Sequence, residues 1–484
     1  MKLKALLLPL MLCVFACGNV AAKIIATDGS QLQLRTALAL AVKGDTVLIK
    51  GSHTYGTGGV SIYIPAGVTL DGQGTAVVNM ALSSPSGYGN ALFTLNEGSV
   101  VRRLTLNGPN ATNCIPFRSS AKDWRVSGIT YNQYAGRSSY FMQVNSSLRG
   151  LIDSNVINGA HGQSEMIFSR GPADAWDVAQ TMGTANNIFI ENNVFNGVGY
   201  INDANSNSRV VVRFNKVNGA FKTDSHGVWS NSPGRGVRHS EIYNNTWAAG
   251  GNFASIEVRG GTGRIFNNTS SASVGAGTTN FVITEYGVFN NNGAFSNYQT
   301  PYDWPIRDQI GRGRYAVAGN WTTATSEPMY IWDNRKGGQP WPWTNVAIPA
   351  AAQTRFKQQM GNPYATFGWT SVIQPDRDYF VDVTSFNGSS GVGRGTKAQM
   401  LAIKGRKVGV GFWVTDEADW NRTNGTVKDG QLYTWSGSAW VLKYTPYTYP
   451  HPMRTGEREV TSAPTWSGSP PTVGGLSPTV GSSM

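Results

Sequence analysis

Cysteine is scarce in this 484-residue chain, which has only three. Cys13 and Cys17 fall in an apolar leader, so Cys114 alone remains in the body of the protein and cannot form an internal disulfide. This excludes a disulfide-stabilised scaffold, and the stability must come from burial and hydrogen bonding. Charged residues are also few, at 14%, whereas glycine is abundant with 58 residues. The length and composition indicate one large β-rich body with appendages.

Long hydrophobic runs are missing as well. The run ALLLPLMLCVFAC at 5–17 has thirteen residues, too few to span a bilayer. Because it follows Lys2 and Lys4 and precedes small residues, we predict an export signal at 1–22, a secreted or periplasmic location and no membrane span. VFAC also loosely resembles a lipoprotein signal. A second expectation is therefore an outer-membrane lipoprotein attached through Cys17.

Several motifs of known chemistry are absent from the sequence: a zinc-binding pattern, a phosphate-binding glycine loop and a nucleophile elbow. GTGR at 261–264 has no flanking helix, so nucleotide binding is not expected. Negative charge is in deficit, since the net charge is +12 and stays at +10 without Lys2 and Lys4. A basic exported protein suits an anionic partner, and a basic surface kept for solubility is the alternative. We expect an anionic polysaccharide as partner, no nucleic acid, and a monomer.

The chain does contain a repeated phrase, an aliphatic residue, two variable residues and asparagine, with a base period of about 23 residues. The phrase occurs as VTLD (68–71, with Asp71 in the asparagine place), LTLN (104–107), ITYN (129–132), IDSN (152–155), IENN (190–193), VRFN (212–215), IYNN (242–245), IFNN (265–268) and VFNN (288–291). IWDN at 331–334 is a candidate late repeat. Short strands at this period predict a solenoid of stacked coils with parallel sheets. We expect Asn193, Asn215, Asn245 and Asn268 to form one stacked ladder.

Residues 30–51 predict a helix with Ser30 as N-cap and Gly44 at its end, followed by the strand TVLI, which together would cover the N-terminal coil. This cap, KGDTVLIKG, the turn GVTLDGQG and the asparagine ladder resemble the right-handed parallel β-helix proteins of the pectate-lyase-like superfamily, over roughly residues 28–334. The resemblance implies an all-β fold with a right-handed parallel β-helix at 23–334.

The composition then shifts toward tryptophan and tyrosine. We predict a C-terminal aromatic-rich β cap or module at 335–460, with a hairpin around SGSA and with its aromatic residues mainly in a core. Residues 461–484 are rich in Pro, Gly, Ser and Thr, which predicts a flexible tail.

Two long coils in succession, of 38 residues between Asn155 and Asn193 and of 30 between Asn215 and Asn245, indicate loops that wall a groove. Charged residues and histidines that could act in catalysis or binding occur near these loops in the sequence. The predicted catalytic residues are His226, Arg259 and Lys222; the predicted substrate-binding residues are His161, Arg235 and Trp229; the predicted metal ligands are Asp224, Glu257 and Glu165. In SIEVRGG, strand alternation places Glu257 and Arg259 outward, and the coil spacing brings His226 within reach of Arg259.

This set suits β-elimination on a uronic acid polymer, in which a carboxylate must be neutralised and a base must remove the neighbouring proton. Arg259 would neutralise the carboxylate, His226 or Lys222 would be the base, and the acidic residues would hold Ca²⁺. TDSHGVW is also similar to the aspartate-x-histidine motif of the β-helix alginate epimerases, which implies His226 as base. Gly227 departs from that motif, where the family carries a second aspartate.

The sequence therefore predicts an exported enzyme that degrades an acidic polysaccharide by β-elimination. One alternative is a glycoside hydrolase with Asp224 and Glu257 as its two carboxylates. Another is a non-catalytic polysaccharide-binding solenoid, such as an adhesin or a tailspike-like protein. If the cluster is only structural, Glu257 and Arg259 would be a surface ion pair, and Lys222, Asp224 and His226 would solvate a turn.

Overall fold

The structure is a computed structural model, and its described part is mostly β with few helices. It describes residues 22–27, 29–59, 61–82, 91–108, 115–133, 140–146, 149–227, 235–249, 255–271, 281–283, 308–317, 324–341, 344–345 and 373–454. The side chains of 161–164, 249, 281–283 and 344–345 are not among the described ones. Residues 1–21 of the predicted signal, Cys114, Trp229, VFNN at 288–291 and the predicted tail lie outside these ranges.

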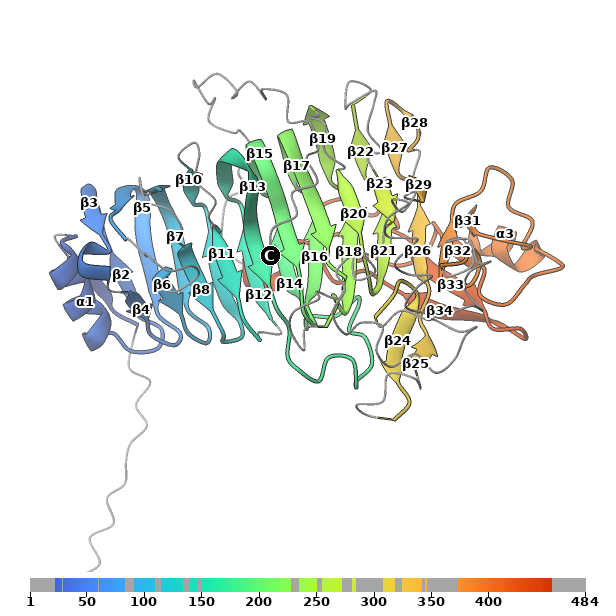
Figure 1. The fold of residues 1–484 in the computed structure, drawn as a ribbon, viewed down its shortest axis with the longest axis horizontal. Coiled ribbons are helices and arrows are strands. Elements are labelled where there is room, and N and C mark those ends of the chain that lie inside the picture. Colours follow the sequence, from blue (N-terminus) through green and yellow to red (C-terminus); the bar gives the residue numbers. More distant parts are fainter. Residues whose placement is uncertain are drawn as a thin grey trace, which may run out of the picture.

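A large parallel sheet dominates the molecule, and 28 of the described strands belong to it. Within this sheet, strands pair in parallel with their counterparts one repeat earlier and one repeat later, which arranges them in three columns along the long axis (Figure 1). The exception is β28 (Gln339–Pro340), which pairs antiparallel with β27. The parallel pairing is consistent with a parallel β-helix.

Column A comprises β1 (Ile24–Ala26), β2 (Thr46–Leu48), the first parts of β5 (Thr69–Met80) and β7 (Val100–Asn107), β9 (Trp124–Ser127), β12 (Gly150–Asp153), β14 (Ile188–Glu191), β16 (Arg209–Arg213), β18 (His239–Tyr243), β21 (Thr262–Phe266), β26 (Met329–Trp332) and β30 (Tyr379–Val381). Column B comprises β3 (Ser52–Tyr55), the second parts of β5 and β7, β10 (Thr130–Asn132), the first parts of β13 (Val156–Ser169), β15 (Val194–Ala204) and β17 (Lys216–Ser225), then β19 (Thr246–Ala249), β22 (Thr269–Ser270) and β27 (Arg335–Lys336). Column C comprises β4 (Ile62–Ile64), β6 (Ala91–Leu95), β8 (Ile115–Ser119), β11 (Met142–Val144), the second parts of β13, β15 and β17, then β20 (Ile256–Val258), β23 (Phe281–Ile283) and β29 (Thr344–Asn345).

The core lies between the three columns and is built from stacked aliphatic side chains. Within column A, equivalent positions of successive strands carry one buried apolar side chain each: Leu70, Val101, Val126, Ile152, Ile190, Val212, Ile242, Ile265 and Ile331. Branched aliphatic residues suit such a pleated, buried surface. Their regular recurrence in the sequence is the origin of the period.

The asparagine ladder is confirmed. Asn193 donates through its Nδ2 atom to Oδ1 of Asn215 over 3.0 Å, Asn215 donates to Asn245 over 2.9 Å, and Asn245 to Asn268 over 3.0 Å. The candidate late repeat is confirmed too, because Asn334 accepts from Asn268 over 2.8 Å. The same Oδ1 atoms also accept backbone N–H groups, so each asparagine satisfies a buried turn at the end of column A.

Placing Asn107 and Asn132 in this ladder was wrong. They belong to a second, half-buried ladder at the end of column B, formed by Asn79, Asn107, Asn132, Asn158, Asn196 and Asn218. Where both ladders pass through one coil, their asparagines lie three residues apart, as Asn155 and Asn158 do, so a single four-residue phrase matches either. Asp71 is in neither ladder; it pairs in register with Arg102 and bonds to the Arg102 and Arg103 side chains.

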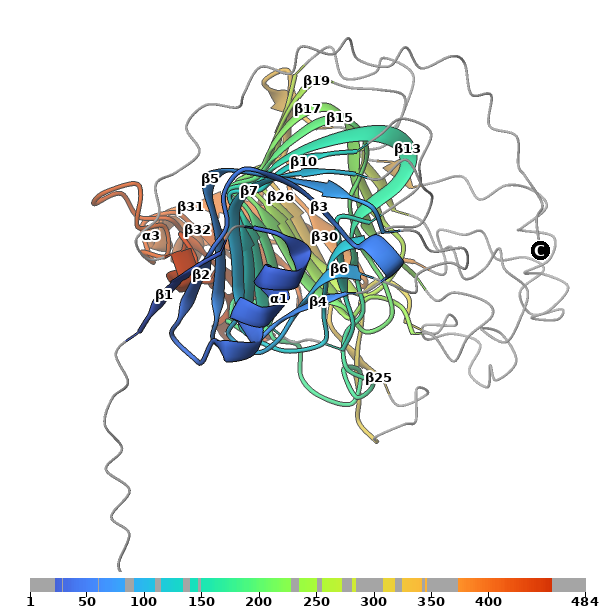
Figure 2. The same ribbon diagram turned by 90° about the vertical axis from the view of Figure 1, so that its left-hand side faces the viewer.

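Helix α1 (Gln31–Leu40) covers the N-terminal end of the columns (Figure 2). Ser30 is the N-cap as predicted, since its hydroxyl accepts from the backbone N–H of Gln33. Leu34 and Leu38 enter the main core. The predicted end at Gly44 was wrong, because the helix stops at Leu40 and Gly44 lies in the turn that leads into β2.

Parallel pairing continues past the predicted boundary at residue 334, since β30 pairs with β26. A small module follows, with β31 (Val392–Gly395), helix α3 (Lys397–Ala402), β32 (Gly411–Val414), β33 (Gln431–Trp435) and β34 (Trp440–Tyr444). The hairpin around SGSA is confirmed, because Trp435 pairs with Trp440 in antiparallel register. Trp413, Trp420 and Tyr449 pack in one buried cluster with side chains of column A, as a core role predicts.

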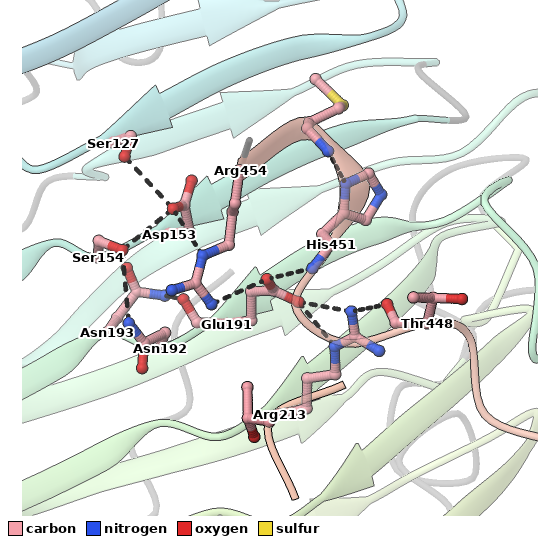
Figure 3. A network of polar contacts seen from close by, with 12 residues as sticks. Ser127, Asp153, Ser154, Glu191, Asn192, Asn193, Arg213, Thr448, His451 and Arg454 are labelled. Carbon is pink, nitrogen blue, oxygen red and sulfur yellow. Dashed lines mark hydrogen bonds and ion pairs between the residues drawn. The ribbon is translucent and has the colours of Figure 1, made fainter. Parts of the chain in front are cut away.

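A strap at 444–454 fastens this module to the outer face of column A through buried charges (Figure 3). Arg213 bonds to Glu191 over 2.7 Å and also donates to two backbone carbonyls of the strap. The backbone N–H of His451 donates to Glu191 over 2.9 Å, and Arg454 lies between Glu191 and Asp153. Because these groups are buried, loss of one partner would leave an uncompensated charge.

Candidate functional site

The outer face of column C carries the predicted cluster. The register places Asp203 beside Asp224 and Asp224 beside Glu257, on three successive strands. The predicted alternation in β20 is confirmed, because Ile256 and Val258 enter the main core while Glu257 lies on the other side. Neighbouring parallel strands are about 4.8 Å apart, so the three carboxyl groups form a row across the face.

Two cations lie within this row of acids. Arg259 forms a two-bonded ion pair with Asp224, one bond being 2.9 Å. The ammonium group of Lys222 bonds to Glu257, lies 3.9 Å from Asp224, and is 4.2 Å from the ring centre of Tyr200. Burial alone lowers the pKa of Lys222, but attraction to Asp224 and Glu257 outweighs it and raises the pKa above its ordinary value. This argues against Lys222 as a base.

The carboxyl group of Glu165 has a raised pKa. Burial, with repulsion from Asp203 and Asp224, raises its pKa to about 8, although a hydrogen bond from Tyr140 opposes the shift. Asp203 is only 4% exposed, and its Oδ1 atom has no hydrogen-bond partner within the described structure. A buried acceptor of this kind marks a place for water or a ligand group.

His226 follows Asp224 and Ser225 at the end of β17. The hydroxyl of Ser225 points inward to Ser240 over 2.7 Å, so alternation places His226 on the outer side. His226 and Arg259 each directly follow the last register pair of these two strands, Ser225 with Val258. Its Nδ1 atom is 2.8 Å from the carbonyl of Gly227, which only accepts, so Nδ1 carries a proton and a neutral ring has its lone pair on Nε2. The side chain is 4% exposed.

The predicted substrate-binding residues have different outcomes. Arg235 bonds to Asp308 over 2.7 and 2.8 Å, and its guanidinium lies over the rings of Trp176 and Tyr315. It is therefore held in a packed structure beside the inserted loop. Trp229 and the side chain of His161 lie outside what the structure describes, so their roles stay predictions.

Calcium binding by Asp224, Glu257 and Glu165 stays a prediction as well. Within the described ranges, no three His, Cys, Asp or Glu side chains are grouped so that they could hold a metal ion. Two of the three proposed ligands are ion-paired with Arg259 and Lys222, and burial raises the pKa of the third, Glu165, to about 8. A bound ion would have to displace these cations or bind beside them.

Tyr140 and Tyr200 were not identified from the sequence. Tyr140 stacks on Phe168 at 5.0 Å beside Glu165, and Tyr200 is paired in register with Lys222 on the next coil. A signal for Tyr200 did exist, because it precedes Lys222 by 22 residues, the length of that coil.

Comparison with known proteins adds little. No protein-family model and no curated protein matches the chain. An alginate lyase from Paenibacillus sp. str. FPU-7 is similar with 15% identity and a TM-score of 0.27, over 56% of this chain and 97% of that chain. A 1,3-alpha-1,4-beta-D-galactose-4-sulfate-3,6-anhydro-D-galactose-2-sulfate 4 galactohydrolase is similar with 10% identity and a TM-score of 0.28, over 54% and 71%. At these TM-scores the likenesses carry no argument, so function is argued from the residues.

The helices in the described ranges are all too short or too polar to cross a membrane.

Proposed function

We propose that this protein is an exported enzyme that cleaves an acidic, uronate-containing polysaccharide by β-elimination on the outer face of column C of a right-handed parallel β-helix. The observation that carries the proposal is the arrangement on this face, where the carboxyl group of Glu165, whose pKa burial raises to about 8, lies with other acidic side chains and two cations. Cleavage of a glycosidic bond leaves an oxygen that needs a proton, and a carboxylic acid with a pKa of about 8 retains one at neutral pH.

The remaining roles follow from the charges. In β-elimination a base removes the proton beside the uronate carboxylate, a double bond forms, and the glycosidic oxygen leaves with a proton from the acid. His226 would take the proton on Nε2, and Glu165 would give its own to the leaving oxygen. Arg259 and Lys222 would hold the substrate carboxylate, whose charge grows as the proton leaves. Tyr200 would position Lys222, over whose ammonium its ring lies.

The charge of the cluster supports a second candidate, hydrolysis. Two cations face the carboxylates of Asp203, Asp224 and Glu257, so an anionic sugar ring enters an environment that is not positive unless Ca²⁺ accompanies it. A glycoside hydrolase needs one protonated and one ionised carboxyl group, and Glu165 with Asp203 would supply that pair.

The product separates the two candidates. The purified protein would be incubated with pectate, alginate and glucuronan, with and without Ca²⁺, while ultraviolet absorbance and reducing ends are both followed. β-Elimination raises both signals, and hydrolysis raises reducing ends alone. Glu165→Gln should abolish either, whereas Glu97→Gln, a change of the same kind at an exposed ion pair with Lys122, should not. Absence of both signals on every polymer would favour the non-catalytic binding solenoid.

A further inference from the structure

A pocket of about 210 Å³ lies between the end of column A and the C-terminal module, and none of its lining residues belongs to column C. One water occupies about 30 Å³ in the liquid, so the pocket has room for roughly seven waters. This is below the usual range for drug-sized ligands, about 300 to 1,000 Å³. The size suits a single sugar unit.

One wall of the pocket comes from three stacked turns. Asn244, Asn267 and Asp333 each precede a ladder asparagine and have φ of +55, +50 and +52°, the left-handed conformation that asparagine and aspartate tolerate. Asn267 donates to the side chain of Asn244. Asp333 is neutralised by Arg335 and Arg394. This wall therefore offers amide groups and a neutralised carboxylate.

The base of the pocket is rigid and aromatic. Phe266 and Trp332 stack in parallel at 4.4 Å, and Trp413 of the module contacts both at 5.1 and 4.9 Å. All three side chains are buried, so little of their surface reaches the pocket. A packed base of this kind loses little conformational entropy when a ligand binds.

The wall from the module holds unused polar groups. Asn424 donates to Asp429, while its own Oδ1 atom is buried and has no hydrogen-bond partner in the described residues. Asp429 also accepts the backbone N–H of Asn421 over 2.7 Å. Lys428 lines the pocket, is exposed, and has no ion-pair or hydrogen-bond partner among the residues that the structure describes. Within the described part of the chain, the pocket thus combines an unsatisfied acceptor with an ammonium group that has no ion-pair partner, beside the carboxylate of Asp429, whose hydrogen bonds come from neutral groups.

We propose that this pocket binds one anionic sugar unit of an acidic polysaccharide, with Lys428 on the acidic group and Asn424 accepting from a hydroxyl. A hydroxyl donor satisfies the buried acceptor, and an anionic group satisfies the ammonium. The polymer is then held at a second place, outside the cluster on column C. The ligand class rests in part on the proposed function, but the contacts are those of the pocket.

Binding of defined trisaccharides tests this site. Trigalacturonate and trimannuronate would be titrated by calorimetry into the Glu165→Gln protein. Neutral maltotriose would be titrated in the same way, to test whether binding requires the negative charge of the sugar. We expect two sites for one of the acidic trisaccharides, and Lys428→Met should weaken one of them at least tenfold. Lys404→Met, an exposed lysine of the same module outside the pocket, should leave both sites intact.

The outcomes separate this site from the proposed activity. Equal binding by the Lys428 and Lys404 variants would overturn the second site, as would binding of maltotriose as tight as that of the acidic sugars. If the unaltered protein cleaves a polymer but Lys428→Met does not weaken trisaccharide binding, the second site alone is overturned. If Lys428→Met weakens trisaccharide binding but the unaltered protein cleaves no polymer, the second site is supported and the proposed activity alone is overturned. Absence of trisaccharide binding overturns the second site.

Discussion

Glu165→Gln should make the protein more stable at alkaline pH while removing its activity. In the unfolded chain this carboxyl group ionises near its ordinary pKa of 4.5, and in the folded protein burial beside Asp203 raises the pKa to about 8. Between these values the folded state holds a proton that the unfolded state has released. Stability therefore falls as pH rises through this window.

The magnitude follows from the two pKa values. At 1.36 kcal/mol per pH unit, the gap amounts to roughly 5 kcal/mol. Glutamine cannot ionise, so the variant should gain up to this free energy of unfolding at pH 9 and almost nothing at pH 4. Turnover should fall by about 10² or more, the usual contribution of a general acid.

Urea denaturation at pH 4, 6.5 and 9 measures the gain, with Glu97→Gln as the control, since its exposed side chain should give no gain that depends on pH. A constant difference between Glu165→Gln and the unaltered protein across the three pH values would refute the reasoning. Glu165 would then be ionised in the folded protein and could not be the acid.

Three further predictions concern the ladder, the strap and the base. Asn215→Leu should lower the free energy of unfolding by roughly 1 to 3 kcal/mol for each buried group left unpaired. The loss should exceed that of Asn218→Leu in the half-buried second ladder, and equal losses in urea denaturation would contradict the ladder's role. Burial lowers the pKa of His451 to about 4, so docking of the strap should weaken as pH falls from about 6.5 to 4. Limited proteolysis should show the strap being released over this pH range in the unaltered protein but not in His451→Gln. Strap release that does not depend on pH would contradict this prediction. His226→Ala should lower kcat by about 10² or more when assayed at a temperature where the variant is folded, and full activity of this variant would pass the base role to another residue. Arg259→Lys should raise KM and lower kcat together, because lysine cannot make two parallel bonds to one carboxylate.

The architecture was predictable because its causes are local and repeat along the chain. Buried aliphatic residues such as Val212 and Ile242 recur once per coil, and the ladder asparagines recur with them. The assignment failed for Asn107 and Asn132 because the two ladders share one local phrase. Only the pairing between strands tells them apart.

The sequence predicted which site residues lie on neighbouring strands, but not which of their side chains bond to each other. Counting residues per coil predicted that His226 and Arg259 lie on neighbouring strands, and each directly follows the register pair of Ser225 with Val258. The choice of Asp224 as the partner of Arg259, and the protonation of Glu165, depend on burial, which no spacing reveals. The docking of the strap on Glu191 joins residues more than 250 positions apart and follows no period.

The pH dependence of cleavage tests the central claim most directly. The initial rate of ultraviolet absorbance on the preferred uronate polymer would be followed from pH 6 to 10 for the unaltered protein and for Glu97→Gln. The rate should fall as one proton is lost near pH 8, as Glu165 ionises, in both proteins. A rate that stays level or rises through pH 8 to 10 would contradict Glu165 as the acid, and reducing ends formed without absorbance would contradict β-elimination.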